Sequence, residues 1–114
     1  MIREIVSQLP MNIDFTSDWI ESTMSDFAGN NEKGMGYIQI IWTGVSANPD
    51  SNIRIEVTND LQYTSVSGTH AVTSVDNSTN ALMIAVYPGF RFLRFIYTAN
   101  TVTSGKLTIN INYE

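Results

Sequence analysis

The 114-residue chain contains no cysteine, one histidine and only two lysines. Without cysteine there is no disulfide framework, no thiolate metal site and no cysteine nucleophile. A single histidine leaves few ways to build a catalytic triad or a metal site with two histidines. The sequence therefore predicts a protein that is not an enzyme and has no catalytic residues, cofactor or bound metal.

Charged residues are also scarce, at 15% of the chain against about 25% in ordinary domains. The formal net charge is −5 with only six cationic residues, which argues against a nucleic-acid partner because phosphate neutralisation needs clustered cations. Asn, Ser and Thr make up about 30% of the chain, so the surface is expected to be polar without being ionic. No run approaches about 18 apolar residues, so we expect no membrane-spanning helix and no membrane partner.

Apolar and polar residues alternate with a period of two over most of the chain, which is the pattern of half-buried strands. Three segments show it most clearly, with apolar faces made by Ile38, Ile40 and Trp42, by Ile53, Ile55 and Val57, and by Leu107, Ile109 and Ile111. Two near-continuous apolar runs, 81–88 and 90–98, are typical of central strands. Weaker strands are expected at 11–15, 19–24, 63–66 and 70–75.

Turn-forming Gly, Pro, Asn and Asp residues separate these segments at regular intervals. This spacing predicts an all-β fold, an antiparallel β-sandwich of about eight short strands that is jelly-roll-like or discoidin-like, in one domain over residues 1–114. Residues 16–27 also fit a helix loosely, since Thr16 or Ser17 precedes acidic residues as a cap would. Residues 1–10 fit either an edge strand or an N-terminal arm that reaches a neighbouring molecule.

The segment PGFRFLRFIYT (88–98) joins four aromatic residues to Arg91 and Arg94. In a strand these two arginines lie on opposite faces, so they cannot form one basic patch. We expect the Arg94 guanidinium to stack on an aromatic ring and to reach a carboxylate or a carbonyl. The segment is therefore interpreted as a core strand and not as a ligand site.

A few other residues suit binding chemistry. Trp19, beside Asp18, is expected to be an exposed aromatic anchor for a neighbouring subunit or a glycan, whereas Trp42 shares a face with isoleucines and is expected in the core. Tyr63 is one of several tyrosines that could stack on a sugar ring. Asx-rich segments at 48–52 and 75–80 offer oxygen ligands for calcium, but turn formation explains them better. His70 is expected at the edge of a loop.

The order of short motifs along the chain carries a family resemblance. The motifs are DFTSDWIE, GMGYIQIIWTG, IRIEVTND followed by YTSV, GFRFLRFIYT and SGKLTININ, and they cover nearly all of residues 14–112. This succession resembles a family of small β-sandwich proteins common among the virion proteins of tailed bacteriophages. The loop with NNEKG and the tyrosine in YTSV, where an indole often stands, depart from the family pattern.

The resemblance implies a structural protein of the virion, assembled in the cytoplasm of the bacterial host, with no catalytic residues. A capsid auxiliary or decoration protein that bridges capsid subunits is expected first, and a tail- or fibre-associated carbohydrate-binding module for adsorption is the alternative. The expected partners are capsid or other virion proteins, further copies of the chain and a possible glycan. The residues expected to contact them are Ile2, Ile5, Val6, Leu9, Trp19, Asn30, Asn31, Asn48 and Asp50.

Overall fold

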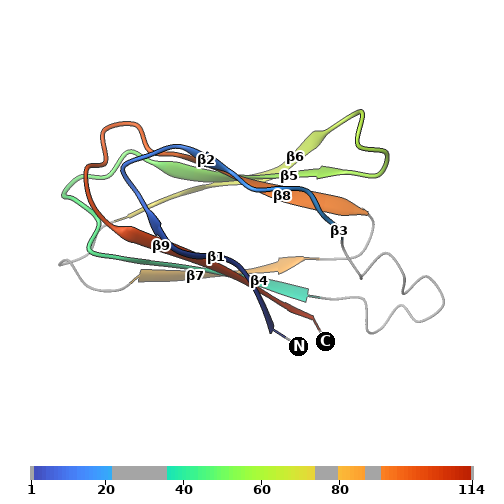
Figure 1. Ribbon diagram of the computed structural model, residues 1–114, viewed down its shortest axis with the longest axis horizontal. Coiled ribbons are helices and arrows are strands. Elements are labelled where there is room, and N and C mark those ends of the chain that lie inside the picture. The colour runs from blue at the N-terminus through green and yellow to red at the C-terminus, as the bar shows by residue number, and fades with distance from the viewer. Residues whose placement is uncertain (1, 22–35, 74–79, 87–90, 114) are drawn as a thin grey trace.

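In the computed structural model of the chain, residues 2–21, 36–73, 80–86 and 91–113 are described. They form nine strands (Figure 1): β1 Ile2–Pro10, β2 Phe15–Thr16, β3 Ile20–Glu21, β4 Gly36–Thr43, β5 Asn52–Thr58, β6 Ser65–Ala71, β7 Asn80–Val86, β8 Phe92–Thr98 and β9 Lys106–Tyr113. These residues contain no helix. Accordingly, the described part of the chain offers no helix with the length and apolar character needed to cross a bilayer.

The strands lie in two antiparallel sheets that face each other across the core (Figure 1). One sheet has the order β1-β9-β4-β7, and the other has the order β2-β8-β5-β6, with β3 also paired to β8. Among the described strands, the chain crosses between the sheets after almost every strand, and only β5 and β6 form a hairpin within one sheet. If β2 and β3 count as one interrupted strand, this is the eight-stranded double sheet of a jelly roll. The predicted all-β antiparallel β-sandwich is confirmed.

The alternation in the sequence defines the core. Three of the central strands send every second side chain inward, and these side chains are 3% exposed or less: Ile38, Ile40 and Trp42 in β4, Leu93, Phe95 and Tyr97 in β8, and Leu107, Ile109 and Ile111 in β9. Fully burying one such side chain stabilises the fold by about 1.5–3 kcal/mol. The expected inward faces of β4 and β9, and the core position of Trp42, are confirmed.

The turn between β1 and β2 is fastened to the core. Met11 is fully buried, and its carbonyl accepts a 2.7 Å hydrogen bond from the Tyr97 hydroxyl. Gly105 lies against it with φ at 128°, and a Cβ at that position would come within 2.8 Å of the Met11 sulfur. Burial raises the pKa of Tyr97 above its ordinary value, which keeps the hydroxyl protonated as a donor.

Of the two alternatives for the N-terminal residues, the structure shows the edge strand and not the arm. β1 pairs with β9 from Ile2, opposite Asn112, to Pro10, opposite Lys106, which also places the two termini side by side (Figure 1). Val6 is only 5% exposed and belongs to the core cluster. Removing residues 1–10 would therefore remove one edge strand and expose the core, whereas removing an arm would leave the fold intact.

Other local expectations also differ from the structure. β7 ends its sheet and is not central, because periodicity reports which faces are covered and not the order of strands. Where two weak strands were expected, at 63–66 and 70–75, the described residues up to position 73 form one strand, β6, and His70 is half-buried at its second-last position. The described part of the helical segment, up to residue 21, holds two short strands on β8. The rest of that segment, from residue 22, lies outside the described residues.

Candidate binding surface

The turn that joins β5 to β6 carries the largest group of exposed apolar side chains in the described residues. Leu61 is 52% exposed, Tyr63 is 75% exposed and Val66, at the start of β6, is 54% exposed. The other large apolar side chain with comparable exposure in the described part is Ile13, in the turn between β1 and β2. We refer to residues 58–66 as the β5–β6 knob; it lies at the opposite end of the long axis from the β1–β2 turn (Figure 1).

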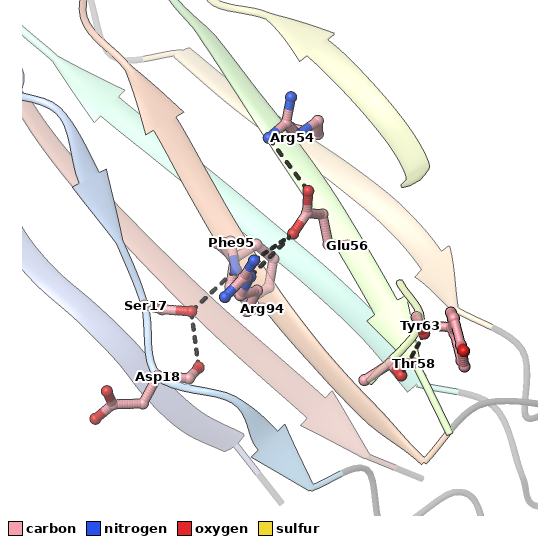
Figure 2. Close-up of polar contacts among 8 residues, drawn as sticks. All are labelled: Ser17, Asp18, Arg54, Glu56, Thr58, Tyr63, Arg94 and Phe95. Atoms are coloured by element: carbon pink, nitrogen blue, oxygen red, sulfur yellow. Dashed lines mark hydrogen bonds and ion pairs between the residues drawn. The ribbon is translucent and has the colours of Figure 1, made fainter. Parts of the chain in front are cut away.

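Two side chains hold the β5–β6 knob in shape. The buried Thr58 hydroxyl donates to the Tyr63 carbonyl at 2.6 Å (Figure 2) and accepts from the N–H groups of Asp60 and Leu61 at 3.3 and 3.1 Å. One Asp60 carboxylate oxygen accepts from the N–H groups of Gln62 and Tyr63, both at 2.9 Å. These backbone donors hold the pKa of Asp60 below its ordinary value. The apolar side chains are therefore presented on a preorganised turn.

The backbone of the β5–β6 knob is strained at one point. Leu61 has φ of 61°, in the left-handed region that bulky residues avoid. Such a conformation costs a residue with a Cβ about 1 kcal/mol. Three other described residues that are not glycine also have a positive φ. Two of them are asparagines, Asn48 and Asn100, which tolerate this conformation through local hydrogen bonds. Leu61 combines this strained backbone with an exposed side chain that is not part of the core cluster.

Trp19 is covered and does not form the expected exposed anchor. The Arg94 guanidinium lies over its ring, 4.4 Å from the centroid. The same guanidinium donates through Nε and Nη2 to one oxygen of Glu56, at 2.9 and 2.8 Å (Figure 2). Arg54 reaches the other oxygen at 3.2 Å. The expectation that Arg94 stacks on a ring and reaches a carboxylate is confirmed, and its partner is the residue that was expected to be free.

A small pocket lies between β1 and the β2–β3 segment. Ser17 shapes it by interrupting the strand: its hydroxyl accepts from the Phe95 N–H at 2.9 Å and donates to the Asp18 carbonyl at 3.0 Å. The Asp18 carboxylate points away from Arg94 (Figure 2). The pocket has a volume of about 210 Å³ and is lined by Glu4, Ile5, Phe15, Ser17, Asp18, Trp19 and Ile20. This is below the roughly 300–1,000 Å³ of ordinary ligand pockets.

The residues expected to contact a partner do not form one surface. Val6 is in the core, and Ile5 and Leu9 are half-buried and pack against it, although Ile5 also lines the pocket between β1 and the β2–β3 segment. Ile2 is paired to β9, and its side chain is not described. Asn30 and Asn31 lie outside the described residues. The two register shifts of β1 break the alternation of apolar residues in the N-terminal segment, so the sequence pattern also fitted an arm that contacts a partner.

Asn48 and Asp50 are exposed, but Asp50 has a structural task. Its carboxylate accepts from the Thr101 N–H at 3.0 Å, and its carbonyl accepts from the Asn100 side chain at 2.8 Å. The hydrogen bonds from Thr101 hold the pKa of Asp50 below its ordinary value. Within the described residues, no group of three or more His, Asp or Glu side chains is placed to hold a metal ion. Asp50 therefore clamps a loop and Asn48 occupies a left-handed turn position, while the second Asx-rich segment, 75–80, lies outside the described residues up to position 79.

The sequence named Tyr63 among several tyrosines and missed Leu61 and Val66. The signal available was an apolar residue directly after the Asn59–Asp60 turn, outside any alternation. A single apolar residue outside any alternation does not predict a binding surface, because the sequence does not show whether its side chain is exposed. The knob therefore emerges only from the folded chain.

No known family model and no curated protein sequence matches this chain. Its structure is similar to a chain from a study of the carbohydrate-binding module CBM4, with a TM-score of 0.50 and 8% identity, over 89% of this chain and 61% of that one. A carbohydrate-binding module from Cellvibrio mixtus lichenase 5A in complex with cellotriose gives 0.45, 16% identity and coverages of 98% and 90%. A chain of Broad Bean Stain Virus gives 0.42, 13% identity and coverages of 70% and 54%. At these identities, the similarity to the CBM4 chain shows a shared β-sandwich fold.

Proposed function

We propose that this chain is a non-enzymatic structural protein of a tailed-phage virion, assembled in the bacterial cytoplasm, which binds capsid subunits as an auxiliary protein. The β5–β6 knob carries the proposal, because Leu61, Tyr63 and Val66 expose apolar area on a rigid turn that the core does not need. Tyrosine is a frequent anchor at protein interfaces, and a preorganised anchor loses little entropy on binding.

The fold and the motif order support the same proposal. Double-sheet jelly rolls occur in viral capsid proteins and in lectins. The short motifs from DFTSDWIE to SGKLTININ resemble those of phage virion proteins. A surface rich in Asn, Ser and Thr makes neutral hydrogen bonds with small desolvation costs, which suits a protein present in many copies on a lattice.

Electron cryomicroscopy of particles that carry the protein tests the location. Density repeated regularly over the shell, with the β5–β6 knob seated in an apolar depression of the capsid subunit, is the expected result. Density confined to the portal, tail or fibres would overturn the capsid role and move the function to tail assembly or adsorption.

A variant pair tests the contact itself. Leu61→Asn combined with Tyr63→Ser is expected to lower incorporation into particles roughly tenfold or more, because truncating an interface anchor costs about 2 kcal/mol or more. Asparagine at position 61 suits the left-handed backbone, so the turn survives. The matched control is Ile13→Ser, which removes an equally exposed apolar side chain at the other end of the sandwich. Unchanged incorporation of the double variant, or equal loss with the control, would overturn the proposed contact.

A carbohydrate-binding module for adsorption is the second candidate, and the pocket beside Asp18 and Trp19 is the observation that favours it. Carboxylates and aromatic rings suit sugar hydroxyls and sugar faces. The pocket holds little more than one ring, however, and the exposed Tyr63 stands on a protruding turn. Binding on a glycan array that is lost in Asp18→Ala and kept in Tyr63→Ser would place this candidate first.

A further inference from the structure

The two lateral edges of the sandwich are built in opposite ways. On one side, β1 has two register shifts and contains Arg3, Glu4 and Pro10. It lies next to β2 and β3, which are two residues each and are separated by Ser17 at the interruption. Bulges, charges, prolines and broken strands are the devices that stop a sheet edge from pairing with another chain. None of the three strands on this side offers a continuous ladder.

The opposite side carries none of the charge or proline devices. β6 and β7 have seven residues each, SVSGTHA and NALMIAV, with no Asp, Glu, Lys, Arg or Pro in either. In the described part of the chain, β6 pairs only with β5, and β7 pairs only with β4. Five of the seven β6 residues are exposed. A single bulge interrupts its register, at Ser67, which has no partner opposite it in β5.

We propose that β6 is a self-association edge that pairs antiparallel with β6 of a second copy of this chain. A two-fold axis generates such a pair from identical strands and closes it as a dimer. Gly68 is the middle residue of the strand and has no side chain to hold the copies apart. Ser67 and Thr69 on either side of it supply hydroxyls for cross-strand hydrogen bonds.

Charge favours a second copy at this edge over other self-contacts. The chain has a net charge of −5, so copies repel each other wherever acidic residues meet. β6 has no Asp, Glu, Lys or Arg, so pairing there brings none of these charges together along the strands. The neutral edge is therefore a place where two acidic chains can approach closely.

Pairing through β6 would let two joined copies bridge capsid subunits, and this step alone rests on the proposed function. The β5–β6 knob lies at the N-terminal end of β6. In an antiparallel dimer the turn residues 58–64 of the two knobs lie at opposite ends of the joined strands, so Leu61 and Tyr63 of both copies stay free. Such a dimer would contact two capsid subunits at once, which converts a weak single contact into a stronger double one.

The mass of the purified chain in solution, by light scattering after size exclusion, tests the dimer. Wild type is expected at twice the 12.7 kDa chain mass, with dissociation on dilution. Ser67→Lys is expected to halve that mass, because lysine at an unpaired edge prevents pairing. Ser7→Lys is the matched control, since Ser7 is also an exposed serine outside the strand register, but on β1. It should leave the mass unchanged.

Several outcomes would overturn the proposal. These are a monomeric wild type at all soluble concentrations, a dimeric Ser67→Lys, or a control that dissociates equally. If circular dichroism shows that Ser67→Lys is unfolded, cysteine cross-linking decides, because the chain has no other cysteine. With Gly68 at the two-fold axis, Ser67 of one copy lies opposite Thr69 of the other, so an equal mixture of Ser67→Cys and Thr69→Cys chains should give disulfide-linked dimers under mild oxidation. A mixture of Ser7→Cys and Thr69→Cys chains should not; a dimer without the first link would exclude the β6 pairing.

The proposed dimer and the proposed capsid contact can each be refuted without refuting the other. A monomeric Ser67→Lys that still enters particles would leave the contact of the knob intact and remove bridging by the dimer. A dimeric wild type that does not bind capsids would keep the dimer and remove the proposed function.

Discussion

Trp19 and Tyr63 are aromatic residues in two surface regions that are built in contrasting ways. Trp19 follows β2 and is covered by the Arg94 guanidinium, which a buried carboxylate, Glu56, holds in place. Tyr63 stands 75% exposed on the β5–β6 knob, where hydrogen bonds restrain its backbone and leave its ring free. In the first region polar groups fix the side chain, and in the second they fix only the main chain.

This difference indicates which region is ready to bind. A ring already stacked on a cation must lose that contact before it meets a partner, so Trp19 mainly stabilises the outer face of its sheet. A ring on a preorganised turn exposes its area without such a loss. The Trp19–Arg94–Glu56 cluster is therefore a structural feature, and the β5–β6 knob is the surface available to another molecule.

The largest effect is expected from breaking the Trp19 cluster. Arg94→Met should lower the free energy of unfolding by about 1–3 kcal/mol, because it strips a nearly buried Glu56 of its two shortest hydrogen bonds while Arg54 still pairs with it. Trp19 should also become more accessible to acrylamide quenching. Urea denaturation and fluorescence quenching measure the two effects.

Arg91→Met is the matched control for this variant. Arg91 also lies over a ring, 5.4 Å from the Phe92 centroid, and faces Glu21 at 3.5 Å, but its side chain is 59% exposed. An exposed pair of this kind contributes about 0–1 kcal/mol. If Arg94→Met and Arg91→Met lower the free energy of unfolding equally, the buried Glu56 carboxylate does not set the Trp19 cluster apart from an exposed ion pair.

A smaller effect is expected from the strained residue of the β5–β6 knob. Leu61→Ala keeps a Cβ in the left-handed conformation, whereas Leu61→Gly removes it. The glycine variant should therefore be as stable as the alanine variant or up to about 1 kcal/mol more stable, although glycine normally lowers stability. Denaturant midpoints of the two variants decide, and an alanine variant that is clearly the more stable would show that position 61 is unstrained.

The inward faces of the strands were predictable from the sequence, whereas the edges were not. The alternation around Ile40 and Ile109 follows directly from the period of a strand, and both residues are buried. Whether β1 is an arm or a strand, and whether β7 is central, depends on hydrogen-bond partners about 40 to 110 residues away. A local pattern contains no record of those partners.

The candidate surface was still harder to predict. The Arg94 stack was predictable as a type of contact, because arginine in an aromatic strand seeks a ring and a carboxylate. That its ring would be Trp19 required the pairing of β3 to β8, with Ile20 opposite Leu93. The exposure of Leu61 required a turn whose hydrogen bonds come from Thr58 and Asp60 and not from the apolar pattern.

The smallest and most local effect concerns Asp60. Because the Asp60 pKa is lowered by N–H groups that bind the ionised carboxylate, the knob should be fully ordered above the unfolded value near 3.8. Order should be lost as pH falls through the lower folded value, since a protonated carboxyl accepts less strongly. Amide shifts of Gln62 and Tyr63 should follow this titration in wild type. Asp60→Asn should abolish it while leaving the midpoint of urea unfolding unchanged; a titration that persists in this variant would assign the pH response to another carboxylate.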